Sequence, residues 1–151
     1  MAKRDYHYEI RKHGELQFIY AAFFDDRDDV YVKVGRSCKP YRRIGDITQG
    51  CPFEVTKAVF TQCGSIPVAT SFELSLQHAL AEHRTRGEWY RFKRDEGKFF
   101  AQAMRATFAR IVGRPLEWSS IDIVKLRREI LESAAKGLPK YAAIANRKKA
   151  A

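Results

Sequence analysis

The chain has 151 residues, of which 45% are hydrophobic and 13% aromatic, so it can bury the core of one domain and is not generally disordered. Its formal net charge is +10, and the last 56 residues carry 12 Lys and Arg against 5 Asp and Glu. This excess excludes a neutral surface and indicates attraction to a polyanion, most simply nucleic acid, although a solvated basic surface would have the same composition.

The cellular compartment of the protein is predicted from its apolar runs and its cysteines. The longest apolar run, 18–24, is far too short to span a bilayer, and we see no signal peptide. Three cysteines without Cys-x-x-Cys spacing favour neither a disulfide framework nor a zinc knuckle. We therefore expect a reducing, cytoplasmic environment.

Two stretches near the N-terminus have the aromatic and β-branched composition typical of strands, and a polar connector joins them as a hairpin. The connector, Asp25–Asp29, contains four aspartates, which fit a solvated hairpin tip better than a metal site because adjacent loop side chains rarely converge on one ion. Pro40 favours the first turn of a short helix that Gly50 must end. In chain order we expect a polar lead-in at 1–14, strands at 15–24 and 30–34, a helix at about 40–48 and a strand at 53–62.

Helix signals dominate the second half of the chain. Ser65 opens a helix whose apolar residues recur at helical spacing and which should stop near Gly87. Asp95 caps a further helix, and Ser119 with Asp122 forms a capping-box variant that opens the last one. In chain order we expect this first helix, an extended segment at 89–92, helices at about 96–112 and 120–136, and a basic tail.

We predict an α+β fold in which a small antiparallel three-stranded sheet is flanked by helices and followed by a basic helical C-terminal extension. No glycine-rich phosphate loop, Gly-x-Ser-x-Gly elbow or His-Glu-x-x-His motif is present. His78 and His83 lie about 140° apart on the expected helix, so they should not share a metal ion easily.

Five short motifs, taken together and in order, resemble the GIY-YIG nuclease superfamily. The resemblance is closest to its divergent phage and microbial branch, which reads Lys-Ile-Gly-Arg where other members read Tyr-Ile-Gly. It covers about residues 16–92 and implies a nuclease domain at 15–95 and a basic extension at 96–151. The motifs are Phe18–Tyr20, Lys33–Ser37, Pro40–Ile44, Phe72–Glu73 and Gly87–Tyr90.

The resemblance implies a metal-dependent endonuclease that hydrolyses DNA phosphodiester bonds. Tyr20 matches the candidate acceptor of a proton from the attacking water, and Lys33 and Arg36 are the cations expected to lower its phenol pKa from about 10. Arg43 matches the arginine that holds the scissile phosphate. Glu73 matches the metal-binding glutamate, which with waters suits Mg²⁺ or Mn²⁺. Taken alone, the tyrosine, arginine and glutamate also fit a core residue and two surface residues.

Some residues depart from the superfamily pattern. Lys33 stands where many members have a second tyrosine, and Phe18 stands in place of a glycine. His78 matches a position often occupied by histidine in this branch and is kept as a catalytic candidate, although it points about 140° away from Glu73 on one helix. Trp89 could stack on a base, but an aromatic that closes the core is the favoured interpretation.

Basic side chains outside the motifs are predicted to contact the phosphates of double-stranded DNA. The alternative function is a catalytically inactive nucleic-acid-binding module of the same fold, such as a phage or mobile-element accessory protein. A third reading makes the basic arm a docking surface for an acidic protein. A homodimer through the C-terminal helices would cover their apolar faces. The predicted phosphate contacts are Lys39, Arg42, Lys125, Arg127 and Arg128.

Overall fold

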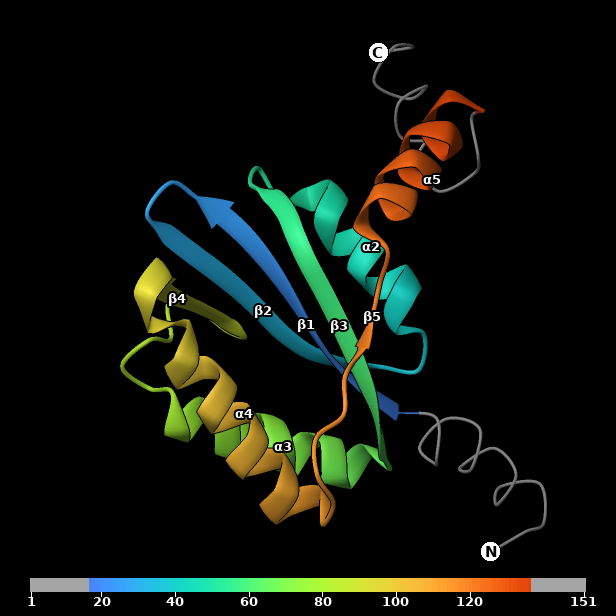
Figure 1. Ribbon diagram of the computed structural model, residues 1–151. Coiled ribbons are helices and arrows are strands. Elements are labelled where there is room, and N and C mark those ends of the chain that lie inside the picture. The colour runs from blue at the N-terminus through green and yellow to red at the C-terminus, as the bar shows by residue number, and fades with distance from the viewer. Residues whose placement is uncertain (1–16, 137–151) are drawn as a thin grey trace, which may run out of the picture. The chain divides into compact units, whose positions relative to one another are not determined.

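The computed structural model describes residues 17–136, which fall into two units (Figure 1). The first unit runs to Ile121 and contains an antiparallel sheet with helices α2, α3 and α4. The second begins at Asp122 and contains helix α5 (Ile123–Ala135). None of the helices within residues 17–136 has the length and apolar character needed to cross a membrane.

The sheet has five strands in the order β4-β2-β1-β3-β5, and all neighbours are antiparallel. The α+β class is therefore confirmed, but the predicted number of three strands is wrong. The short segment before the third helix pairs with β2, and Ser119, which was expected to open the last helix, pairs with β3 together with Ser120. The strands are β1 (Gln17–Asp26), β2 (Asp29–Ser37), β3 (Glu54–Gly64), β4 (Trp89–Lys93) and β5 (Ser119–Ser120).

The hairpin between β1 and β2 is tighter than its sequence indicates. Asp26 pairs with Asp29, so only Arg27 and Asp28 form the turn, and Arg27 has a left-handed φ of 54°. Asp29 was expected at a solvated tip, but it is only 8% exposed. Its carboxylate contacts side chains of the neighbouring strand β4, which the local sequence of the hairpin could not reveal.

Helix α2 (Pro40–Gly50) begins and ends as predicted. Helix α3 (Ile66–Ala79) begins after Ser65, whose hydroxyl accepts a hydrogen bond from the Val68 amide at 3.5 Å. It ends eight residues before Gly87, because the following segment turns back and pairs with the residues of β4. The Arg91 amide donates to the His83 carbonyl at 2.8 Å.

The two C-terminal helices show how local caps position an element. Helix α4 (Gly97–Val112) follows a 3₁₀ turn, η1 (Arg94–Glu96). The predicted cap by Asp95 is wrong, because Asp95 lies within this turn and Glu96 precedes the helix without a side-chain cap. The helix ends at Gly113, whose φ of 83° suits glycine. Helix α5 is capped by Asp122, whose carboxylate accepts from the Lys125 amide at 3.1 Å. The predicted role of Ser119 in this cap is wrong, because Ser119 belongs to β5.

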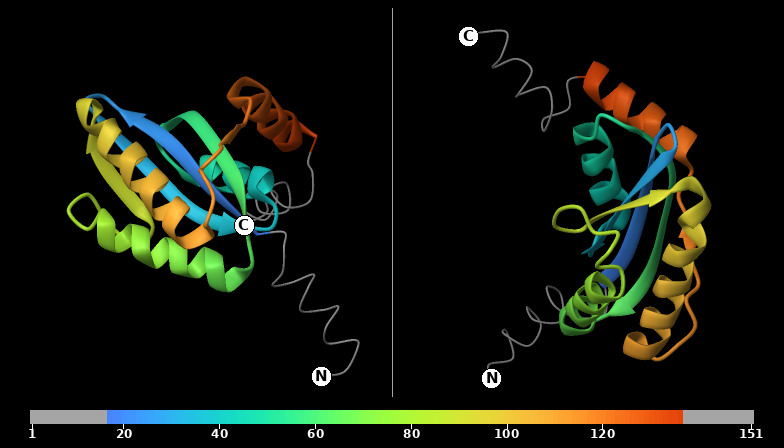
Figure 2. Two further views of the ribbon diagram at one scale, coloured as in Figure 1. Left: turned by 60° about the horizontal axis from the view of Figure 1, so that its bottom comes forward. Right: turned by 90° about the vertical axis from the view of Figure 1, so that its left-hand side faces the viewer.

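The sheet packs on both faces, with α2 on one side and α4 on the other (Figure 2). On the α4 side lies the main apolar core, and α4 contributes to it although the sequence assigned that helix to the extension. On the α2 side, Tyr20, Ala22 and Phe24 of β1 are buried together with Ile44 of α2. The main core includes Ile19, Ala21, Val32, Val34, Phe72, Leu76, Phe100, Met104 and Phe108.

Candidate active site

Tyr20 lies at the centre of the sheet, on the α2 face. It pairs with Gly35 of β2 and is 1% exposed. A Cβ atom at residue 35 would lie 2.3 Å from the Tyr20 hydroxyl oxygen, so a side chain there would displace the phenol. The glycine of the Lys33–Ser37 motif is therefore explained by the close approach of Tyr20 to the β2 backbone.

Arg43 of α2 is the cation that contacts this phenol. It is itself exposed, and its side chain hydrogen-bonds to Tyr20. Burial raises the pKa of Tyr20, the Arg43 contact opposes that rise, and the carboxylates of Glu88 and Glu73 add to it. The expectation that Lys33 and Arg36 would lower this pKa is wrong, because Arg43 is the cation that contacts the phenol and the effect of burial is larger than that of Arg43.

Glu73 projects from α3 beside Phe72, which is buried in the main core. The Glu73 side chain is 13% exposed, and its Oε2 lies 3.9 Å from Arg36 Nε. Its Oε1 is buried and has no hydrogen-bond partner among residues 17–136. Burial, with a smaller effect of Glu88, raises the pKa of Glu73 to about 7, although Arg36 and Lys33 lower it. The described residues around Glu73 therefore do not supply enough positive charge and hydrogen bonds to stabilise its ionised form.

Glu88 is a second carboxylate, and it belongs to the Gly87–Tyr90 motif, for which no charged role was predicted. Its Oε2 lies 2.8 Å from Lys33 Nζ, and its backbone carbonyl accepts a hydrogen bond from the Val34 amide at 3.1 Å. Lys33 pairs with Trp89 across the β2–β4 ladder, which brings Glu88 to the same end of β2. The pairing of the Gly87–Tyr90 motif with β2 is the signal that could have identified this residue.

These side chains form one group, here named the charged cluster. Tyr20 contacts Arg43, Glu73 lies near Arg36, and both carboxylates act on the pKa of Tyr20. Five of the six predicted catalytic residues are therefore brought together, with Glu88 added by the structure. The members of the charged cluster are Tyr20, Lys33, Arg36, Arg43, Glu73 and Glu88.

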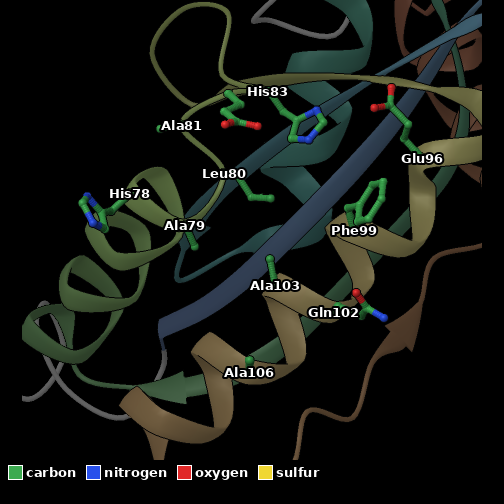
Figure 3. A pocket seen from close by; sticks show the side chains of 11 residues that line it. His78, Ala79, Leu80, Ala81, His83, Glu96, Phe99, Gln102, Ala103 and Ala106 are labelled. Carbon is green, nitrogen blue, oxygen red and sulfur yellow. The ribbon is translucent and has the colours of Figure 1, made fainter.

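His78 lies apart from the charged cluster. It is exposed near the end of α3 and lines a hollow of about 740 Å³ with residues of α4 (Figure 3). His83 lines the same hollow but stacks on Phe92, with ring centroids 4.4 Å apart. Within residues 17–136 no group of three or more His, Cys, Asp or Glu side chains could hold a metal ion. A metal at the charged cluster would thus have few protein ligands.

The predicted phosphate contacts divide between the two units. Lys39 and Arg42 are exposed around the first turn of α2, the helix that carries Arg43. On α5, Lys125 and Arg128 are exposed, Arg127 is half-buried, and Lys125 Nζ lies 4.0 Å from Glu129 Oε1. The role of all five in DNA binding stays a prediction.

The antiparallel sheet, its helices and the charged cluster define a small domain of the α+β class. The chain belongs to the T5orf172 domain family, which matches residues 17–105 and so spans the whole charged cluster. Domains of this family occur in phage and mobile-element proteins and are associated with nucleases and nucleic-acid binding. No curated protein and no solved structure matches the chain.

Proposed function

We propose that this protein is a metal-dependent endonuclease that hydrolyses DNA phosphodiester bonds at the charged cluster. The observation that carries this proposal is the buried Oε1 of Glu73, which finds no hydrogen-bond partner in the described part of the chain. Buried polar atoms are nearly always paired, so an unpaired carboxylate oxygen calls for a ligand. The resemblance to GIY-YIG nucleases and the T5orf172 membership support the same reading.

A divalent cation fits this carboxylate. Mg²⁺ commonly binds one or two carboxylates and completes its octahedron with waters and phosphate oxygens, so a single protein ligand is enough. Glu73 would hold the ion, and the charge of Glu88 would add to its attraction. When bound, the ion would polarise the phosphate and stabilise the leaving oxygen. It would also offset the charges of Glu88 and Glu73, which add to the rise that burial causes in the pKa of Tyr20.

The side chains of the charged cluster suit the remaining parts of hydrolysis. The exposed guanidinium of Arg43 can donate to a non-bridging phosphate oxygen while it contacts Tyr20. An attacking water forms the new oxygen–phosphorus bond, the bond to the leaving oxygen breaks, and the proton of the water passes to the Tyr20 phenolate. Lys33 and Arg36 hold the two carboxylates in place and limit the net negative charge that would repel the phosphate.

Nicking of supercoiled plasmid DNA tests this proposal. We expect cleavage with Mg²⁺ or Mn²⁺, none with EDTA, and a severe loss in Glu73→Gln and Arg43→Ala. The matched controls are Glu82→Gln and Arg110→Ala, which alter exposed side chains outside the cluster. Cleavage in EDTA, or a Glu73→Gln variant as active as Glu82→Gln, would overturn the proposal.

A nucleic-acid-binding module without catalysis is the second candidate. The raised pKa of Tyr20 favours it, because a phenol that stays protonated can bind phosphate but cannot accept a proton from water. Binding that weakens steeply with salt, without nicking under any of several divalent ions, would establish this function.

A further inference from the structure

A second hollow, of about 490 Å³, adjoins the charged cluster and shares Lys33 and Arg43 with it. It lies between β2, the start of β4, helix α2 and the segment that leads into β3. This volume falls within the range of about 300–1,000 Å³ that is usual for small-ligand sites. A ligand that reaches Arg43 can therefore extend into this hollow without leaving the protein surface.

Aromatic rings form much of its lining. The rings of Tyr31 and Phe53 are stacked, with centroids 5.1 Å apart and planes 6° from parallel. Trp89 packs on Phe24 at 5.4 Å, and Lys33 Nζ lies 5.8 Å from the Trp89 ring centroid. Tyr31, Phe53 and Trp89 are each half-buried, so part of every ring stays accessible. These three residues are named the aromatic pocket.

The register of β2 relates this pocket to the phosphate site. Residues 31, 33 and 35 lie on one face of the strand at intervals of about 7 Å. Gly35 lies against the Tyr20 hydroxyl, Lys33 comes next, and Tyr31 follows within the aromatic pocket. An anion-binding end and a flat aromatic end thus adjoin one another, as the phosphate and base of a nucleotide do.

We propose that the aromatic pocket binds one unpaired nucleobase next to the scissile phosphate, so that the protein acts on single-stranded DNA in preference to intact duplex. The position of the phosphate rests on the proposed function. A base within a duplex is stacked and paired, and it can enter a pocket only after it leaves that stack. Because every base has a flat π face, stacking on aromatic rings discriminates little between sequences.

Binding to strands with and without bases tests the pocket directly. The Trp118→Phe variant leaves Trp89 as the single tryptophan of the chain. We titrate it in EDTA with a thymidine oligomer of about 12 nucleotides and with an abasic strand of equal length and charge. We expect the thymidine strand alone to quench Trp89 fluorescence and to bind about tenfold more tightly, as one stacked base implies.

Two variants keep the test independent of folding defects. Tyr31→Leu should lose most of the base-dependent affinity, whereas Phe99→Leu, an exposed aromatic outside the pocket, should retain it. A duplex that quenches Trp89 as strongly as the single strand does would overturn the preference for single strands, because a base flipped out of the duplex would then occupy the pocket. Equal affinity and equal fluorescence for abasic and thymidine strands would overturn the pocket.

Failure of the pocket and failure of the nuclease proposal give different results. If only the nuclease proposal is wrong, base-dependent binding and quenching persist while no metal supports cleavage. If only the pocket is wrong, metal-dependent cleavage persists and abasic strands bind as tightly as strands with bases.

Discussion

Asp29 and Glu73 are carboxylates of the same unit with nearly equal exposure, yet their surroundings are opposite. The Asp29 side chain is 11% exposed and lies 2.6 Å from Arg91 Nη2 and 2.8 Å from Lys93 Nζ. Its pKa is lowered, chiefly by the hydrogen bond from Lys93. The Glu73 side chain is 13% exposed, its Oε2 lies 3.9 Å from Arg36 Nε, and its pKa is raised to about 7.

This difference separates a carboxylate that stabilises the fold from the one that we propose to hold the metal ion. Asp29 uses its charge to hold the edge strand β4 against the hairpin, and both of its oxygens have partners. Glu73 keeps one oxygen without a hydrogen bond to any described residue, and its charge acts on the pKa of Tyr20. A buried polar atom without a partner lowers the stability of the fold, and such atoms are typical of ligand-binding sites.

The largest expected effect is on catalysis. Glu73→Gln should slow plasmid nicking at least about a hundredfold, because it removes the negative charge that would hold the metal ion. Asp29→Asn should leave the nicking rate per folded molecule near that of the wild type. Initial rates, corrected for the folded fraction from circular dichroism, measure both. Equal losses in the two variants would contradict the division between the two carboxylates.

Gly35→Ala should damage both stability and activity. The new Cβ would lie 2.3 Å from the Tyr20 hydroxyl oxygen, so the buried phenol must move away from Arg43. Such overpacking costs about 1–3 kcal/mol in the free energy of unfolding, and we expect nicking to fall with the displaced phenol. Urea unfolding measures the first effect. Gly97→Ala is the matched control, since nothing lies within 4 Å of its Cβ position. Unchanged nicking in Gly35→Ala would show that the position of the phenol does not matter.

The two carboxylates should also respond to pH with opposite sign. The folded-state pKa of Glu73 lies above its usual 4.5, so its ionisation costs stability, and the cost grows as pH rises through about 7. At pH 8, Glu73→Gln should therefore be more stable than the wild type, by about 1–2 kcal/mol after allowance for solvent screening. At pH 5 the difference should be small.

Asp29→Asn should show the reverse behaviour. The pKa of Asp29 is lowered, so its carboxylate adds stability above its usual pKa, and this contribution is lost as pH falls through the lowered value. The variant should be less stable than the wild type at neutral pH and should approach it in acid. Urea unfolding at several pH values measures both variants, and parallel curves would contradict the argument.

What the sequence could predict depended on how local each signal is. Pro40 and Gly113 act on their own helix ends, and both ends were located correctly. The order of the motifs predicted that Tyr20 and Arg43 belong to one site, and in the structure these two side chains are in contact. These features need no knowledge of distant parts of the chain.

The ion pairs between charged side chains could not be predicted. They depend on the register of strands that lie far apart in the sequence. Lys33 pairs with Glu88, 55 residues away, and Lys93 pairs with Asp29, 64 residues away. The direction of the Tyr20 pKa was also wrong, since burial is a property of the packed sheet and α2 rather than of the hairpin. The edge strands β4 and β5 explain why the sheet is wider than predicted.

The smallest expected effect is stabilisation by the metal ion itself, which needs no cleavage to be seen. An ion that binds only the folded protein adds about 1 kcal/mol when its concentration is about five times its Kd, and this shifts the melting temperature by a few degrees. At pH 8 we expect Mg²⁺ or Ca²⁺ to raise the melting temperature of the wild type and of Asp29→Asn, but not of Glu73→Gln.

The shift should decrease as pH falls through about 7, because protons then compete with the ion for the Glu73 carboxylate. Differential scanning fluorimetry at pH 6 and pH 8 measures this dependence, and choline chloride of matched ionic strength controls for salt. A shift that Glu73→Gln retains would locate the ion elsewhere. A shift lost in Asp29→Asn would assign the site to the carboxylate that already has two cationic partners, and the contrast between the two residues would fail.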